Sequence, residues 1–179
     1  MRLIATAGIM IACAAATPAA ALSNHGWDQA STVGRDALVV AAFGIPAVQQ
    51  DWKGDEQAAL SIGAAFAVTK VLKQVIPEER PDHSNHHSFP SGHTSSSFAA
   101  AATLEKRYGW KVGIPAHLVA AFVGVARVQA DKHFVHDVIA GAVIGEAAGW
   151  LVTSKRDAKV QWLPYGDSHG GGVSVAMHF

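Results

Sequence analysis

Cationic side chains recur at three points of the chain where apolar stretches stop. Lys73 and Arg80 lie within "KQVIPEERP", the short stretch "PSGH" occupies 90–93, and Arg127 lies within "RVQADKHFVHD". Arginine offers a planar fork that fits phosphate oxygens, and lysine adds a compact positive charge. If the fold brings these segments together, the sequence predicts an anion site suited to phosphate.

The "PSGH" stretch combines a helix start with a titratable side chain. We expect a helix to open at Gly92, so that the N–H groups of its first turn, which lack intrahelical partners, point at an anion. Glycine at this position lets the backbone approach the anion closely. His93 can then donate a proton to a leaving oxygen. The stretch therefore predicts a phosphate cradle with a proton donor attached.

His133 and Asp137 are separated by four residues, a spacing that places both on one face if the segment is helical. A carboxylate on one ring nitrogen fixes the tautomer and leaves the other nitrogen as a nucleophile. His136 adjoins Asp137, but its spacing from Arg127 differs, so we expect only a mild effect of its removal. Each pair alone is common on protein surfaces, and only the combination points to catalysis.

Together the three segments resemble the signature of the type-2 phosphatidic acid phosphatase superfamily, which reads K-x6-RP, then PSGH, then SR-x5-H-x3-D. The first part is matched from Lys73 to Pro81, the second at 90–93, and the third by Arg127, His133 and Asp137. One departure is Ala126, where the family usually has serine, so a hydroxyl near the phosphate is missing. The signature covers 73–137.

This resemblance implies a metal-free phosphatase site, without a cofactor, in a helical bundle. It assigns the phosphate oxygens to three cations and one helix start: Lys73, Arg80, Arg127, Ser91 and Gly92. It also implies that His133 attacks phosphorus to form a phosphohistidine, that Asp137 orients it, and that His93 protonates the leaving group and then activates water. Lipid phosphates, prenyl diphosphates and small phosphomonoesters all present the same group to such a site.

Two other classes of protein compete with this interpretation. Vanadate-dependent haloperoxidases resemble the same signature, although they are generally much longer. A non-enzymatic metal-binding module could be built on "HSNHH", which contains His83, His86 and His87. Metal ligands must be neutral or anionic, so three neighbouring cations disfavour the metal module. With 14 basic and 14 acidic residues, the chain gives no reason to expect a nucleic-acid partner.

The elements that must position these residues are predicted to be helices. The periodicity, together with proline and glycine breaks, predicts an all-α bundle of about five helices that ends in a short β-hairpin or strand. The expected helices are 31–43, 55–75, 92–107, 115–128 and 135–153. Pro115 is expected in the first turn of the fourth helix, and Asp55 is expected to cap the second. "KVQWLPY" and "GGGVSVAMHF" are predicted to pair as the hairpin.

The start of the chain indicates a signal peptide. Arg2 is followed by an apolar run and by small residues up to Ala21, which is typical of a secretory leader cleaved after that residue. Residues 22–179 are then expected to form a single phosphatase domain. Cys13, the only cysteine, would be removed with the leader, which excludes disulfides from the mature chain.

Two apolar stretches, at 114–126 and 138–152, decide the expected location. Both are shorter than the roughly 20 residues that span a bilayer, and Glu146 interrupts the second. We therefore expect an exported, periplasmic protein whose apolar helices form a compact core and which contacts the membrane surface to reach a phosphorylated lipid. The alternative is a small integral membrane phosphatase with its site at the periplasmic face.

Overall fold

The computed structural model describes residues 22–156, 160–167 and 170–177. The predicted signal peptide at 1–21 lies outside the described residues and stays a prediction. Five helices and two strands follow in the order α1 (Asn24–Val48), α2 (Trp52–Val75), α3 (Gly92–Tyr108), α4 (Trp110–Gln129), α5 (Val135–Val152), β1 (Val160–Asp167) and β2 (Gly170–Met177). The two strands pair antiparallel as a hairpin. The predicted all-α bundle with a C-terminal hairpin is confirmed.

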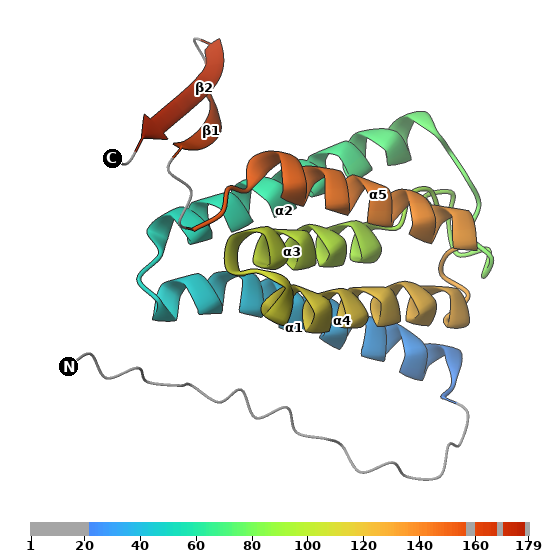
Figure 1. The fold of residues 1–179 in the computed structure, drawn as a ribbon. Helices are drawn as coiled ribbons and strands as arrows, with labels where there is room; N and C mark the ends of the chain where they lie inside the picture. Colours follow the sequence, from blue (N-terminus) through green and yellow to red (C-terminus); the bar gives the residue numbers. More distant parts are fainter. Residues whose placement is uncertain (1–21, 157–159, 168–169, 178–179) are drawn as a thin grey trace.

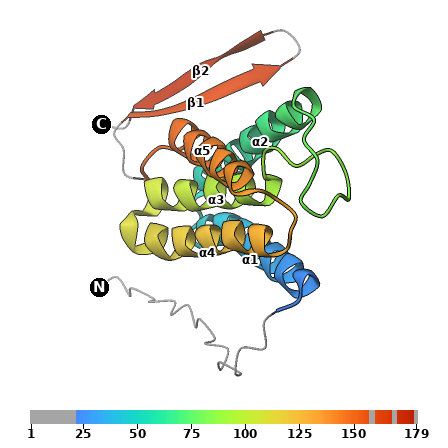
Figure 2. The ribbon, with the colours of Figure 1, turned by 90° about the vertical axis from the view of Figure 1, so that its right-hand side faces the viewer.

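Helix α3 is the centre of the bundle. Figures 1 and 2 show it between the pair α2 and α5 on one side and the pair α1 and α4 on the other. Its buried face is made of small side chains, including the fully buried run Ala99–Ala102. Small residues allow neighbouring helices to approach closely, so the position of α3 follows from its composition.

Helix α5 packs against α3 through three glycines: Gly141, Gly145 and Gly149. A Cβ atom on Gly145 would lie 2.4 Å from the carbonyl oxygen of Ser95, and one on Gly141 would lie 2.6 Å from that of Ser91. Side chains at these positions would therefore push α5 away from the backbone of α3. The glycine-rich stretch "AGAVIGEAAG" is explained by this close approach.

Three helices are longer at their N-terminal ends than the sequence predicts. Ser23 caps α1 by accepting a hydrogen bond from the Gly26 amide at 3.2 Å. Asp51, not Asp55, caps α2 through the Gly54 amide. Helix α4 begins at Trp110, directly after Gly109 with φ 87°, so the expected start near Pro115 is wrong. These helices therefore begin at capping residues that lie upstream of their predicted starts.

The expectation of a compact bundle with apolar helices hidden in its core is also wrong. Four helices, α1, α2, α4 and α5, are long and apolar enough to cross a membrane. Large apolar side chains point outward on each of them, among them Val40, Phe66, Leu118 and Val143, which are between 60% and 69% exposed. The core itself is built mostly from alanine and other small residues. These surfaces indicate a membrane-associated protein.

His117 of α4 and Glu146 of α5, which lie away from the ends of their helices, are paired with each other. His117 Nε2 lies 2.6 Å from Glu146 Oε1, and His117 Nδ1 lies 3.1 Å from Glu105 Oε2 on α3. A charged group inside an apolar environment is tolerated when it has such partners. The sequence alone suggested that Glu146 disfavours a membrane location. Because Glu146 is paired with His117, this argument does not hold.

Candidate active site

The three signature segments meet at one end of the bundle. This end contains the end of α2, the loop 76–91 with the start of α3, and the connection from α4 to α5, all at the right in Figure 1. The amide of Ser91 donates a hydrogen bond to the carbonyl oxygen of Asp137 at 3.0 Å, which fixes the start of α3 against the first turn of α5. Because α2 and α4 end here and α3 and α5 begin here, the turns between these consecutive antiparallel helices assemble the site.

Asp137 is fully buried and holds His133 in position. Its Oδ2 atom accepts hydrogen bonds from the Ser88 hydroxyl at 2.6 Å and from the Phe134 amide at 2.9 Å. Nδ1 of His133 lies 3.3 Å from the same oxygen. A proton on Nδ1 satisfies this contact and leaves the Nε2 lone pair for a nucleophilic attack. The predicted His133–Asp137 pair is brought together.

His133 itself is only 2% exposed in a positively charged environment. Burial lowers the pKa of its imidazole to about 4, and the nearby charges of Arg80, Arg127 and Lys73 act in the same direction. Asp137 opposes this shift through its contact with Nδ1. His133 is therefore neutral at neutral pH, which is the state a nucleophile requires.

Lys73 and Arg80 are held by the loop 76–91. Lys73 Nζ donates to the carbonyl oxygens of His87 and Ser88 at 2.7 and 3.0 Å. Arg80 donates from Nε to Asn85 Oδ1 at 3.0 Å and from NH1 to the Lys132 carbonyl at 3.2 Å. The "HSNHH" loop thus positions the cations of the site through its backbone and Asn85.

Arg127 carries a buried donor without a partner. The residue is 4% exposed, and its Nε atom is buried with no hydrogen bond to any described residue. A buried donor left unsatisfied costs about 1–3 kcal/mol. A phosphate oxygen at this position would satisfy it. The same guanidinium donates from NH1 to Asp28 and, at 3.1 Å, to the Ser31 hydroxyl.

Ser91 and Gly92 form the start of α3 as predicted. Ser91 is the N-cap, and its Oγ accepts a hydrogen bond from the Thr94 hydroxyl at 2.9 Å. The nearest protein atom to a Cβ built on Gly92 is a methyl of Thr69 at 3.8 Å. Packing within the protein therefore does not require a glycine at this position. The missing side chain leaves space where an anion would meet the amides of the helix.

His93 lies on the α1 side of the site. Its Nε2 lies 3.2 Å from NH1 of Arg35 and 3.2 Å from the hydroxyl of Thr32. Because Arg35 donates, Nε2 accepts, and the imidazole is neutral. Burial, and then the charges of Arg127 and Arg35, lower the pKa of His93 to about 3. An arriving phosphate would neutralise these charges and favour protonation of His93.

Helix α1 contributes a set of site residues that the sequence analysis missed: Asp28, Ser31, Thr32 and Arg35. They follow the helical spacing of three to four residues, which places them on one face. That pattern was visible in the sequence, but nothing in it indicated that this face meets Arg127 and His93. Ser31 also brings a hydroxyl to Arg127, in a site where Ala126 provides none.

His136 links the site to the loop rather than to the phosphate pocket. Its Nε2 lies 2.7 Å from Glu78 Oε1 and 3.3 Å from Asp137 Oδ1, and its ring stacks on Phe134. Within the described residues, Glu78, His136 and Asp137 are the group whose ligand atoms could hold a metal ion. The 2.7 Å distance is that of a hydrogen-bonded pair. None of His83, His86 and His87 belongs to this group, contrary to the metal-module interpretation.

The helical bundle and its cluster of cations and histidines are those expected of a phosphatase. Comparison with known proteins identifies the family. The model of the PAP2 superfamily matches residues 57–161, so the chain belongs to this superfamily. The predicted resemblance is confirmed.

Several curated relatives are named phosphatases. The chain is 34% identical over 139 residues to a decaprenylphosphoryl-5-phosphoribose phosphatase of Mycolicibacterium smegmatis, covering 70% of each chain. It is 30% identical over 118 residues to a lipid A 1-phosphatase of Porphyromonas gingivalis, covering 64% of this chain and 26% of the relative. It is 33% identical over 87 residues to a lipid A 4'-phosphatase of Helicobacter pylori, covering 49% of this chain and 43% of the relative. The match thus spans less than half the length of these two lipid A phosphatases.

Two solved structures share the fold. A transmembrane PAP2-type phosphatidylglycerolphosphate phosphatase from Bacillus subtilis aligns with a TM-score of 0.57 at 28% identity, covering 72% of this chain and 73% of that one. The LpxE protein of Aquifex aeolicus aligns with a TM-score of 0.62 at 22% identity, covering 72% and 83%. Both likenesses agree with the helical bundle.

Proposed function

We propose that this protein is a metal-independent phosphatase that hydrolyses phosphate esters of lipids through a phosphohistidine intermediate. The observation that carries the proposal is His133, which is buried and neutral, bonded to Asp137 through Nδ1 and surrounded by Lys73, Arg80 and Arg127. Phosphoryl transfer needs mainly positioning and charge stabilisation, which three cations and a helix start supply.

In the first step, Nε2 of His133 attacks phosphorus, and the bond to the ester oxygen breaks. His93 donates its proton to that oxygen, so the alcohol leaves neutral. In the second step, neutral His93 takes a proton from water while the water oxygen attacks phosphorus and the phosphorus–nitrogen bond breaks. The phosphate takes the proton of His93 as it leaves, so both histidines return to the neutral state that they have in the phosphate-free site.

The proton on His93 arrives with the substrate. Its pKa of about 3 in the phosphate-free site means that His93 carries no proton there at neutral pH. A phosphate monoester has a second pKa near 6, so it enters partly as the monoanion and can transfer its proton to His93. The Arg35 contact at Nε2 must then open to let this nitrogen donate to the leaving oxygen.

A lipid phosphate is the substrate class that the molecule supports best. The site lies at one end of a bundle whose outer helices could cross a membrane, which is where the head group of an embedded lipid is located. The relatives named above act, by their names, on lipid A or decaprenylphosphoryl compounds. We further propose that the chain is an integral membrane protein with this end at the periplasmic face.

Phosphate release from a lipid phosphate in detergent micelles tests the proposal. The purified protein is expected to be active in excess chelator, to be inhibited by vanadate, which adopts the geometry of the transition state, and to lose activity in His133→Ala. His83→Ala is the matched control, because His83 is an exposed histidine of the same part of the chain that pairs only with Glu79. Activity that disappears in chelator and returns with added metal contradicts the mechanism.

A further inference from the structure

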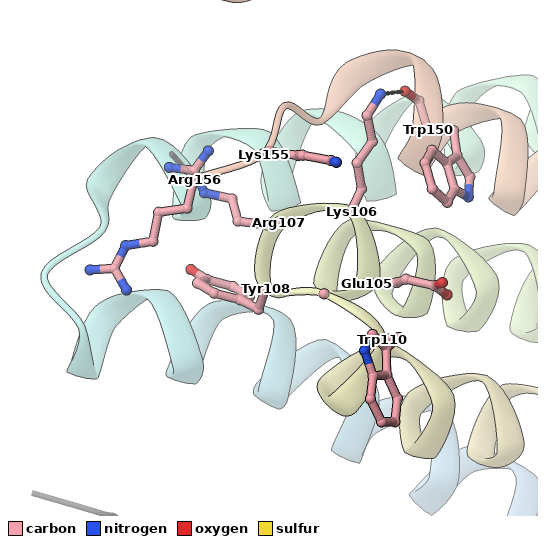
Figure 3. Close-up of a pocket in the computed structure, with 9 residues that line it drawn as sticks. Glu105, Lys106, Arg107, Tyr108, Trp110, Trp150, Lys155 and Arg156 are labelled. Atoms are coloured by element: carbon pink, nitrogen blue, oxygen red, sulfur yellow. Dashed lines mark hydrogen bonds between the residues drawn. The ribbon is translucent and has the colours of Figure 1, made fainter. Parts of the chain in front are cut away.

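A second cavity lies at the opposite end of the bundle from the active site. It has a volume of about 490 Å³ and is bounded by the end of α3, the start of α4 and the end of α5 (Figure 3). Its cationic lining consists of Lys106, Arg107, Lys155 and Arg156. The guanidinium of Arg107 is engaged in a buried pair with Asp51 and that of Arg156 binds Gln49, so Lys106 and Lys155 are the cations that face the cavity.

The cations of this cavity are placed by contacts with neighbouring elements. Lys106 donates to the carbonyl of Trp150 and lies 5.4 Å from the centre of its ring. Arg156 binds the backbone carbonyl of Gln49 at 3.3 Å. Lys155 is exposed and forms no hydrogen bond or ion pair with other described residues. In Figure 3 the Lys106 and Lys155 side chains approach each other over the cavity.

Glu105, the only carboxylate among the described residues that line the cavity, is engaged elsewhere. Its Oε2 lies 3.1 Å from Nδ1 of His117 on α4. The cavity therefore presents a net positive lining to a ligand. It can hold a group as large as a phosphate with a short polar substituent.

Two tryptophans flank these cations, as expected for a membrane–water interface. Trp110 and Trp150 line the cavity and are 63% and 45% exposed. Exposed tryptophans gather where a bilayer meets water. Helix α3 has 17 residues, so its two ends are about 25 Å apart, close to the roughly 30 Å thickness of a bilayer core. When the active-site end lies at one interface, this cavity lies at the other.

We propose that this cavity binds the phosphate of an anionic phospholipid head group, with Lys106 and Lys155 as its cationic partners. A lipid is favoured over dissolved phosphate because the acyl chains would lie along the exposed apolar faces of α4 and α5, next to the tryptophans. The bound lipid would connect the end of α5 to the α3–α4 turn. The site is separate from the active site and goes beyond the proposed phosphatase function.

Thermal unfolding of the full chain in neutral detergent tests this site. Added phosphatidylglycerol, at about 100 times its Kd, is expected to raise Tm by roughly 5–10 °C, because the lipid binds only the folded state. Phosphatidylcholine is expected to have little effect. The shift is expected to shrink by more than half in Lys155→Gln and to persist in Lys111→Gln. Lys111 is an exposed lysine at the same end that does not line the cavity.

Each result decides the proposal. If Lys111→Gln loses as much of the Tm shift as Lys155→Gln, or if the shift is unchanged in Lys155→Gln, the lipid is held by diffuse electrostatic attraction and the proposed site is wrong. The same shift with inorganic phosphate, lost in Lys155→Gln, overturns the assignment to a lipid. Because Lys155 is exposed and has no hydrogen bond or ion pair with another described residue, the variant is expected to fold and to hydrolyse substrate at the rate of the unaltered protein. Hydrolysis assays therefore separate a failure here from a failure of the proposed function.

Discussion

His133 combines two features that are rarely found together, a position inside a group of cations and a neutral state. Burial and the charges of Lys73, Arg80 and Arg127 disfavour its protonated form, and Asp137 compensates only in part. The same cations that would bind phosphate therefore keep His133, the proposed nucleophile, neutral. One arrangement of charges serves both purposes.

Removal of the nucleophile is the sharpest prediction at the residue scale. His133→Ala is expected to lower kcat by roughly 10⁴-fold or more, because nucleophile and proton donor act as a unit. His136→Ala is expected to be mild, since Ser88 and the Phe134 amide still hold Asp137. Steady-state rates of the two variants check this. An inactive His136→Ala beside an active His133→Ala would show that the nucleophile is misassigned.

The pH dependence follows from the lowered pKa of His133. A histidine whose pKa falls from its ordinary 6.5 to about 4 on folding stays neutral, and nucleophilic, down to that pH. The acidic limb of kcat/KM is therefore expected near pH 4, after correction for ionisation of the substrate near pH 6. Protonation of His133 also favours the unfolded state, so stability is expected to fall between about pH 6.5 and 4. An acidic limb near pH 6.5 would contradict this environment.

At the scale of elements, α1 completes the site. Its residues Asp28 and Arg35 contact Arg127 and His93, which belong to the signature segments. The family model begins at residue 57, beyond this helix. His93, the proposed proton donor, is therefore contacted by a part of the chain outside the matched region.

Removal of the Arg35 charge is expected to raise the pKa of His93. Arg35→Gln takes away a cation that opposes protonation and the N–H group that occupies Nε2. Histidine signals in an NMR titration of the protein in micelles measure the shift. Arg35→Lys keeps the charge and should leave the pKa lower than in Arg35→Gln. Equal values in the two variants and the unaltered protein would exclude this role for α1.

The contact between α3 and α5 gives a prediction about packing. Gly145→Ala forces a Cβ within 2.4 Å of the Ser95 carbonyl and is expected to destabilise the fold by about 1–3 kcal/mol. It should also lower activity, because the same helices carry His93 and Asp137. Gly63→Ala on α2 is the control, since no atom lies within 4 Å of its added methyl. Equal melting temperatures of the two variants would contradict the close packing.

At the scale of the whole molecule, the small-residue core and the apolar exterior are reversed from the pattern of a water-soluble bundle. Alanine, serine and glycine fill the interior around α3, and valine, leucine and phenylalanine cover the outer helices. A soluble protein rarely exposes so much contiguous apolar surface. The outer surface is suited to lipid.

Extraction of membranes with alkaline carbonate checks the location. The protein is expected to stay in the pellet and to enter solution only with detergent, because four apolar helices would remain in the bilayer. A peripheral membrane protein of the same preparation serves as the control for extraction. Release of this chain together with that control would restore the exported, surface-bound alternative.

The sequence alone determined the signature residues and most of the helical architecture. The spacing between His133 and Asp137 is local, so one helical turn is enough to bring the two side chains together. Such a pair can be recognised from the sequence before the fold is known. These features depend on neighbours in the chain.

Only the tertiary structure decided which distant side chains complete the site and which faces meet the membrane. Asp28 and Arg127 are 99 residues apart, and Arg35 and His93 are 58 apart, so no local pattern links them. The apolar stretch 114–126 counted by itself is too short to cross a bilayer, but α4 begins at Trp110 rather than near Pro115 and has 20 residues. Whether an apolar side chain belongs to the core or to a lipid-facing surface depends on which other helices cover it, and only packing determines that.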